Sequence, residues 1–151
     1  MTTVLAMNGP NLNLLGTREP GIYGSETLAE IVSRLRDHAT SRDVELRDFQ
    51  SNSEGDLVTM LHTSREDVDG VILNAGALTH YGVALRDAIS GTGLPVVETH
   101  ISNVHAREEF RKTSVIAPVC IGIVAGFGAD SYHVAFEGLI RYLEKHGSDE
   151  A

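Results

Sequence analysis

The chain has 151 residues, 42% of them hydrophobic and 22% charged, and this composition is ordinary for a globular protein. We expect one domain over residues 1–151, with a frayed tail from about residue 147. The net charge of −9 argues against a nucleic-acid partner, because a phosphate backbone requires a clustered positive surface. No apolar run approaches the ~20 residues of a membrane span, and no basic segment followed by a long apolar run opens the chain. We therefore expect a cytoplasmic protein without a membrane partner.

Short β-branched runs alternate along the chain with segments of helical periodicity, which is typical of βα units around a parallel sheet. Most of the runs are continuously apolar, as expected of strands that are covered on both faces. Only the second run is amphipathic, so we place it at an edge of the sheet. The predicted strands are residues 3–8, 44–49, 70–74, 95–100 and 119–125.

Helical segments separate the predicted strands. Thr27 and Glu30 form a capping box ahead of an apolar stripe, and Ser53 with Asp56 opens the next helix in a similar way. Further helices are predicted around residues 83–90 and 106–112, and at the C-terminus on the apolar residues Val134, Leu139, Ile140 and Leu143. The order of elements predicts an α/β, flavodoxin-like, doubly wound five-stranded parallel sheet of order 2-1-3-4-5, with helices on both faces.

Polar residues follow the first, third and fourth predicted strands, at residues 8–11, 74–76 and 98–100. In a doubly wound sheet, ligands bind beyond the carboxyl ends of the strands, so these segments predict one pocket. The loop over residues 8–24 is too long for a simple βα connection and is typical of a lid or binding segment. It lacks the glycine spacing of a dinucleotide fingerprint and the end of a P-loop, which disfavours FMN or NAD.

Three long segments resemble the signatures of the type II 3-dehydroquinate dehydratases, in the same order along the chain. They are NGPNLNLLGTREP at residues 8–20 with Tyr23-Gly24, NAGALTH at 74–80 with ALRDA at 84–88, and ETHISNVHAREEFR at 98–111. The family usually has small hydroxyl residues after Thr79-His80, whereas this chain has Tyr81-Gly82, which adds bulk near the pocket or at a subunit contact.

The resemblance implies a lyase made of a single catalytic domain, without a cofactor or metal. It removes water from 3-dehydroquinate by anti elimination through an enolate and gives 3-dehydroshikimate. Both aromatic biosynthesis and quinate breakdown use this step, and the sequence does not choose between them. The resemblance also implies a homododecamer, a tetramer of trimers.

The family's catalytic roles fall on five positions of this chain. Tyr23 matches the base, and Arg18 on the same loop matches the arginine that holds it as a phenolate. His100 matches the general acid, with Glu98 two residues earlier on the same strand face to orient it. Asn11 matches the group that polarises the enolate oxygen through a water, although an asparagine that only satisfies its turn is the alternative.

The remaining matches concern substrate binding. The side chains of Asn74, His80 and Arg111 match groups that bind hydroxyls, and the backbone N–H groups of Ile101 and Ser102 match the carboxylate site. Asp87 matches a residue that reaches the site of a neighbouring subunit. Arg107 matches a position near the site whose role is not separable from structural support.

The other reactive side chains of the sequence fit different chemistries less well. A Schiff-base route requires a desolvated lysine, and only Lys112 and Lys145 are present, both in polar segments. Cys120 is expected to be a buried strand residue rather than a nucleophile. The other histidines, His38, His62, His105, His133 and His146, lack ligand spacing, so we expect no metal site. A non-catalytic flavodoxin-like ligand-binding domain remains the alternative function.

Overall fold

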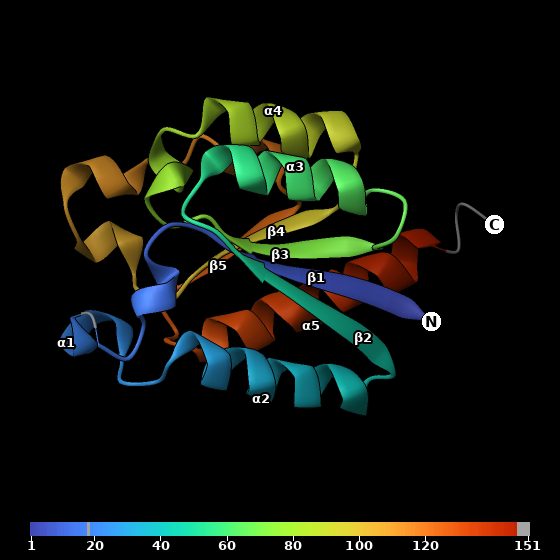
Figure 1. The fold of residues 1–151 in the computed structure, drawn as a ribbon, viewed down its shortest axis with the longest axis horizontal. Coiled ribbons are helices and arrows are strands. Elements are labelled where there is room, and N and C mark those ends of the chain that lie inside the picture. Colours follow the sequence, from blue (N-terminus) through green and yellow to red (C-terminus); the bar gives the residue numbers. More distant parts are fainter. Residues whose placement is uncertain (18, 148–151) are drawn as a thin grey trace.

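A five-stranded parallel sheet forms the centre of the molecule, in the computed structural model that describes residues 1–17 and 19–147 (Figure 1). The strand order is β2-β1-β3-β4-β5, so the predicted order is confirmed. The amphipathic strand β2 lies at an edge, as its alternating pattern predicted. The strands are β1 Thr2–Asn8, β2 Val44–Gln50, β3 Gly70–Asn74, β4 Val96–His100 and β5 Gly122–Ala125.

Helices cover both faces of the sheet. The helices α2 (Leu28–Ser41) and α5 (Asp130–Gly147) lie against one face, and α3 (Glu54–Ser64) and α4 (Val83–Thr92) lie against the other (Figure 1). The two predicted N-caps are confirmed, because Thr27 Oγ1 accepts from Glu30 N at 3.2 Å and Ser53 Oγ accepts from Asp56 N at 3.2 Å. These bonds satisfy backbone N–H groups that the first helical turn leaves unpaired.

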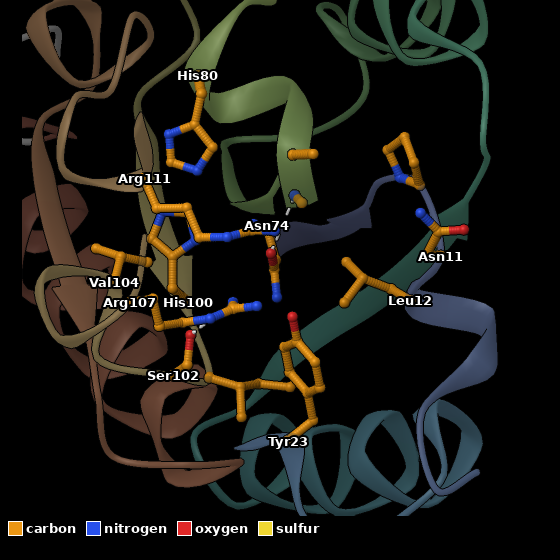
Figure 2. A pocket seen from close by; sticks show the side chains of 14 residues that line it. Asn11, Leu12, Tyr23, Asn74, His80, His100, Ser102, Val104, Arg107 and Arg111 are labelled. Carbon is orange, nitrogen blue, oxygen red and sulfur yellow. Dashed lines mark hydrogen bonds between the residues drawn. The ribbon is translucent and has the colours of Figure 1, made fainter. Parts of the chain in front are cut away.

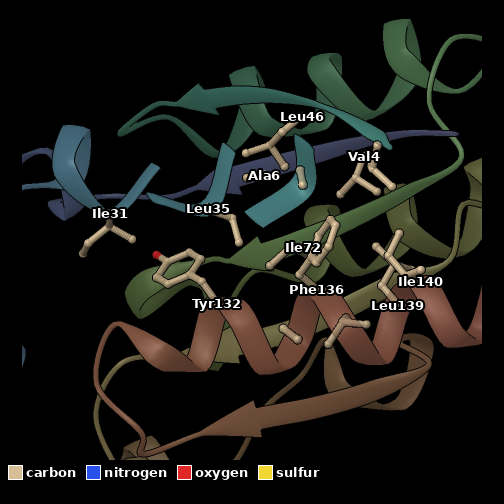
Figure 3. Close-up of a cluster of buried hydrophobic side chains, with 14 of the residues drawn as sticks. Val4, Ala6, Ile31, Leu35, Leu46, Ile72, Tyr132, Phe136, Leu139 and Ile140 are labelled. Carbon is tan, nitrogen blue, oxygen red and sulfur yellow. The ribbon is translucent and has the colours of Figure 1, made fainter. Parts of the chain in front are cut away.

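Each face of the sheet has its own apolar core. On the side of α2 and α5, Leu35, Ile72 and Phe136 are fully buried (Figure 3). On the side of α3 and α4, the fully buried side chains include Leu61 and Leu85. Burying one such side chain contributes about 1.5–3 kcal/mol, so the two cores hold the strands and their carboxyl ends firmly in register.

The connection from β4 to β5 differs from the prediction, because no α-helix forms there. The segment predicted as a helix at 106–112 contains one 3₁₀ turn, Glu109–Lys112, and overlaps the last residue of another, Val104–Ala106. A third 3₁₀ turn, Ala117–Val119, occupies the start of the predicted last strand. Cys120 N donates to Ala117 O at 3.1 Å to close this turn, so Cys120 is a half-buried residue ahead of β5, and the predicted strand position was wrong.

The edge strand β5 and helix α5 expose apolar side chains that their sequence patterns suggested would be covered. Ile123 is 53% exposed on β5, and Val134 is 47% exposed on α5. The other predicted apolar positions of α5, Leu139 and Ile140, do face the core. Hydrophobicity alone could not predict that Val134 is exposed, because only one side of α5 packs against the sheet. No helix in residues 1–17 and 19–147 is long and apolar enough to cross a membrane.

Gly9 allows the chain to turn from β1 directly over the end of β3. Its N–H donates to Asn74 O at 2.8 Å, and a Cβ at this position would lie 2.5 Å from Ala75 O. Only glycine permits such a close approach of two backbones. The long first loop therefore starts its path above the strand ends, where the polar residues lie.

Replacing Gly9 with alanine should lower the free energy of unfolding by about 1–3 kcal/mol, the usual cost of overpacking against a rigid neighbour. The matched control is Gly91→Ala in α4, where an added Cβ meets nothing within 4 Å. This control should be neutral or stabilising by up to ~1 kcal/mol, because alanine favours the helix. Urea unfolding of both variants measures the difference, and equal stabilities would contradict the close approach.

Candidate active site

A pocket lies beyond the carboxyl ends of β1, β3 and β4, under the first loop (Figure 2). The structure thus brings the three polar segments of the sequence together, as the doubly wound topology leads us to expect. The pocket is lined by Pro10, Asn11, Leu12, Tyr23, Asn74, Gly76, Ala77, His80, His100, Ile101, Ser102, Val104, Arg107 and Arg111.

Glu98 and His100 form a buried pair at the end of β4. Both side chains point to the same face because residues two apart on a strand do so. Glu98 Oε2 lies 2.6 Å from His100 Nε2, and the side chains are 3% and 7% exposed. The carboxylate occupies one ring nitrogen and fixes the plane of the imidazole, which leaves Nδ1 to act toward the pocket.

Ser114 is a partner of this pair that the sequence did not indicate. Its hydroxyl donates to Glu98 Oε1 at 2.7 Å and accepts from Ala117 N at 3.0 Å. Because the backbone N–H can only donate, the serine proton must point to the carboxylate. Both oxygens of Glu98 are therefore held, one by Ser114 and one by His100. Ser114 lies in the irregular β4–β5 connection, where no periodic pattern marks it.

Tyr23 and Arg107 face each other across the pocket. Tyr23 is the last residue of the short helix α1 (Pro20–Tyr23), and its hydroxyl points into the pocket (Figure 2). The Arg107 guanidinium lies 5.1 Å from the centre of the Tyr23 ring, within the range of a cation–π interaction. The sequence placed Arg107 near the site without a separable role, and this contact gives it a specific partner there. Arg18, the predicted partner of Tyr23, lies outside the described residues.

The positive charge of Arg107 has no carboxylate partner in the described part of the chain. Its Nη1 donates to Ser102 Oγ at 3.3 Å, and its Nε is buried without a hydrogen-bond partner among these residues. A partly desolvated cation without a counter-charge favours a nearby anion. This arrangement suits either a phenolate at Tyr23 or a negatively charged ligand.

The backbone determines which atoms Asn74 and His80 can present. Asn74 Oδ1 accepts from Gly76 N at 3.2 Å, which identifies the amide oxygen. His80 Nδ1 lies 2.8 Å from Thr113 O, and since a carbonyl only accepts, the proton is on Nδ1. A neutral His80 therefore has Nε2 as a hydrogen-bond acceptor. Both side chains line the pocket, so they can distinguish donors from acceptors on a polar ligand.

The other predicted site residues divide between the pocket and the surface. Ile101 and Ser102 follow β4 and line the pocket, as does Arg111, whose Nε lies 2.9 Å from Glu108 Oε2. The hydrogen bond from Arg111 lowers the pKa of Glu108. Asn11 lines the pocket with a left-handed backbone (φ 70°) and makes no side-chain cap bond. The turn conformation therefore suits asparagine, but its amide is not used to hold the turn.

Asp87 and Tyr81 lie outside this pocket. Asp87 is exposed on α4, and Tyr81 is 63% exposed. Tyr81 does not itself line the pocket, and bulk near the pocket and a subunit contact both remain predictions for it.

Known proteins resemble the chain over nearly its whole length. The family model described as dehydroquinase class II matches residues 2–140. The chain belongs to the class II dehydroquinases. A 3-dehydroquinate dehydratase of Synechococcus sp. (strain WH7803) is 54% identical over 140 residues, which are 93% of this chain and 95% of the relative. One from Carboxydothermus hydrogenoformans is 49% identical over 148 residues, 98% and 96% of the two chains.

A solved structure agrees with this assignment. The crystal structure of the type II dehydroquinase from Butyrivibrio crossotus superposes with a TM-score of 0.90 at 41% identity, and covers 91% of this chain and 97% of that one. The flavodoxin-like fold of this class II dehydroquinase is thus shared with a solved member of the family.

Two groups of residues outside the pocket have packing roles in the dehydroquinase. His38 Nδ1 lies 2.8 Å from His133 Nδ1, and His38 Nε2 lies 2.8 Å from Glu137 Oε1, so this cluster joins α2 to α5. Burial and the nearby His38 lower the pKa of His133. Burial, together with Glu98, raises the pKa of Cys120 to about 12, so its thiol stays protonated. In residues 1–17 and 19–147 no group of three potential ligands could hold a metal ion.

Replacing Ser114 with alanine should lower kcat about tenfold and leave KM nearly unchanged. Without the serine, Glu98 Oε1 loses its hydrogen bond at a cost of ~1–3 kcal/mol, and the carboxylate no longer holds the imidazole of His100 in one orientation. Ser90→Ala on the exposed surface of α4 is the control and should behave like the parent enzyme. Steady-state kinetics measures both. An unchanged kcat in Ser114→Ala would show that Glu98 holds its position without the serine.

Proposed function

We propose that Tyr23 and His100 carry out an anti elimination, as base and acid respectively, on opposite sides of the substrate ring. The overall activity is that of a type II 3-dehydroquinate dehydratase, a lyase step of the shikimate pathway. The observation that carries the proposed mechanism is the presence, in one pocket, of a tyrosine whose ring contacts a cation and of a histidine held by a buried carboxylate.

The base step requires a phenolate. A tyrosine without neighbouring charges is only about 0.1% ionised at pH 7, which is too little base for an efficient enzyme. In this mechanism Arg107, whose guanidinium contacts the Tyr23 ring, and Arg18 on the same loop stabilise the negative charge of the phenolate oxygen. The phenolate then takes the C2 proton, which is acidic because it lies beside the C3 ketone.

The acid step uses the Glu98–His100 pair. The leaving C1 hydroxyl takes a proton from His100, and the adjacent carboxylate stabilises the imidazolium before this transfer. Between the two steps the negative charge lies on the C3 oxygen of an enolate. Asn11 at the pocket rim polarises this oxygen through a bound water.

The remaining groups of the pocket suit an anionic polyhydroxy substrate. The backbone N–H groups of Ile101 and Ser102 take the carboxylate, and Asn74, His80 and Arg111 take the ring hydroxyls. Support for this assignment comes from the charges in the lining. Arg107 and Arg111 line it, and Arg111 pairs with Glu108, whereas Arg107 forms no ion pair in the described part of the chain. The acid Glu98 beneath the pocket is already engaged by His100 and Ser114. A locally positive pocket in a chain of net charge −9 favours a small acid.

The enzyme assembles, in this proposal, as a tetramer of trimers in which Asp87 completes the site of a neighbouring subunit. Two observations support it. Asp87 is exposed on α4 and does not line the pocket of its own chain. Large apolar side chains near the pocket rim are exposed to solvent in the single chain, namely Tyr81 at 63%, Val83 at 58% and Phe110 at 57%. A subunit contact would cover them.

The direct test is the appearance of the absorbance of the conjugated enone product when the protein is mixed with 3-dehydroquinate. Borohydride added to enzyme and substrate should leave the activity and the mass of the chain unchanged, because the mechanism forms no Schiff base. A mass adduct on Lys112 or Lys145 would replace this mechanism with a covalent one. Absence of any product would favour the non-catalytic binding domain.

Arg107→Ala should lower kcat, because the cation that contacts the Tyr23 ring and stabilises negative charge on its oxygen is removed. Arg18→Ala should act in the same direction, and Tyr23→Phe should remove most activity. Arg36→Ala on the exposed face of α2 removes an equal charge far from the pocket and is the control. If Arg107→Ala raises KM and leaves kcat unchanged, Arg107 binds substrate instead.

A further inference from the structure

A chain of buried hydrogen bonds lies beneath the pocket and joins β1, β3 and α5. Asn74 Nδ2 donates to Tyr132 Oη at 3.0 Å, and Tyr132 Oη donates to Asn8 Oδ1 at 2.5 Å. Asn8, Asn74 and Tyr132 are exposed by only 1%, 3% and 1%. Tyr132 belongs to none of the family segments that the sequence analysis singled out, and it does not line the pocket.

The direction of each hydrogen bond in this chain is determined. Gly76 N donates to one amide atom of Asn74, and a backbone N–H cannot accept, so that atom is the oxygen. The amide nitrogen therefore faces Tyr132, and the single hydroxyl proton of Tyr132 must go to Asn8 Oδ1. Burial raises the pKa of Tyr132 well above its ordinary value, so the hydroxyl keeps this proton.

We propose that Tyr132 is a positioning residue: Gly76 N–H identifies the amide oxygen of Asn74, and Tyr132 holds the amide nitrogen in place so that it presents an N–H donor to the substrate. The amide nitrogen has two hydrogens, and Tyr132 takes only one of them. Asn74 lines the pocket, and its amide nitrogen points toward the space between Tyr23 and Arg107 (Figure 2). The second hydrogen is thus available to a ligand. The atom that it meets must be an acceptor, such as a hydroxyl or carboxylate oxygen.

The inference rests on the proposed function for the identity of the substrate, but the hydrogen-bond direction does not depend on it. Without the hydroxyl of Tyr132, the amide nitrogen would be held by nothing at that end, and Asn8 Oδ1 would lose its donor. The Asn74 amide would then be held only at its oxygen, by Gly76 N, and its nitrogen would no longer be fixed in the position that the substrate needs. A residue that acts this way should affect substrate binding more than turnover.

Tyr132→Phe tests the proposal, because it removes one oxygen and retains the buried ring. We expect KM for 3-dehydroquinate to rise about tenfold, the effect of one misplaced hydrogen-bond donor, while kcat changes by less than about threefold. Phe136→Leu, one turn along α5 in the same core, is the control for lost stability without a lost hydroxyl. It should lower the melting temperature and leave KM unchanged.

A double-mutant cycle with Asn74→Ala separates positioning from general damage. If Tyr132 acts through Asn74, adding Tyr132→Phe to Asn74→Ala should raise KM no further. The proposal is overturned if Tyr132→Phe leaves KM unchanged, or if it raises KM by the same factor with and without Asn74. These outcomes are read on an active parent enzyme. A parent that forms no dehydroshikimate would instead refute the proposed function, which keeps the two failures apart.

Discussion

The requirement that buried polar groups find partners governs the carboxyl edge of this sheet. Asn8, Asn74, Glu98 and His100 are all at most 5% exposed, at positions where neighbouring strands end. Each unpaired group there would cost about 1–3 kcal/mol, which is a large share of the stability of a small domain. In the fold, a backbone N–H, which can only donate, sets the direction of these hydrogen bonds. Gly76 N donates to the amide oxygen of Asn74, and Ala117 N donates to Ser114 Oγ, which therefore donates to Glu98. The orientations of the Asn74 amide and the Ser114 hydroxyl are thereby determined before any ligand arrives.

The same requirement is left unmet at a few atoms, and these lie close to the site. Thr79 Oγ1, Thr99 Oγ1 and Arg107 Nε are buried without a hydrogen-bond partner in the described part of the chain. Thr79 and Thr99 directly precede the pocket histidines His80 and His100 in the sequence, Thr79 in the 3₁₀ helix Gly76–His80 and Thr99 in β4. Binding sites often retain unpaired polar atoms, because their hydrogen-bond partners are present only in the ligand-bound form.

Local signals in the sequence accounted for the sheet and for the helix starts. Continuous apolar runs gave the strands, the one alternating run gave the β2 edge, and Thr27 and Ser53 marked helices through short-range capping. The same reasoning failed between β4 and β5. The apolar residues around Pro118 are compatible with a strand, but they form a 3₁₀ turn. Ser114, Arg107 and Tyr132 could not be assigned roles from local pattern. Their partners lie elsewhere in the chain, up to 124 residues away for Tyr132 and Asn8, and only the fold brings them together.

The bond between Asn8 and Tyr132 ties the first strand to the last helix, and this has a consequence for the order of folding. During synthesis, β1 through β4 can emerge and pair before α5 exists, so the hydrogen bonds beneath the pocket are incomplete until the C-terminal helix docks. Loop closure over so long a separation is entropically slow, which makes docking of α5 a late event. A ligand that engages Asn74 would in turn favour the docked helix by mass action. Ligand binding in the pocket and docking of α5 should therefore be coupled, so that each favours the other.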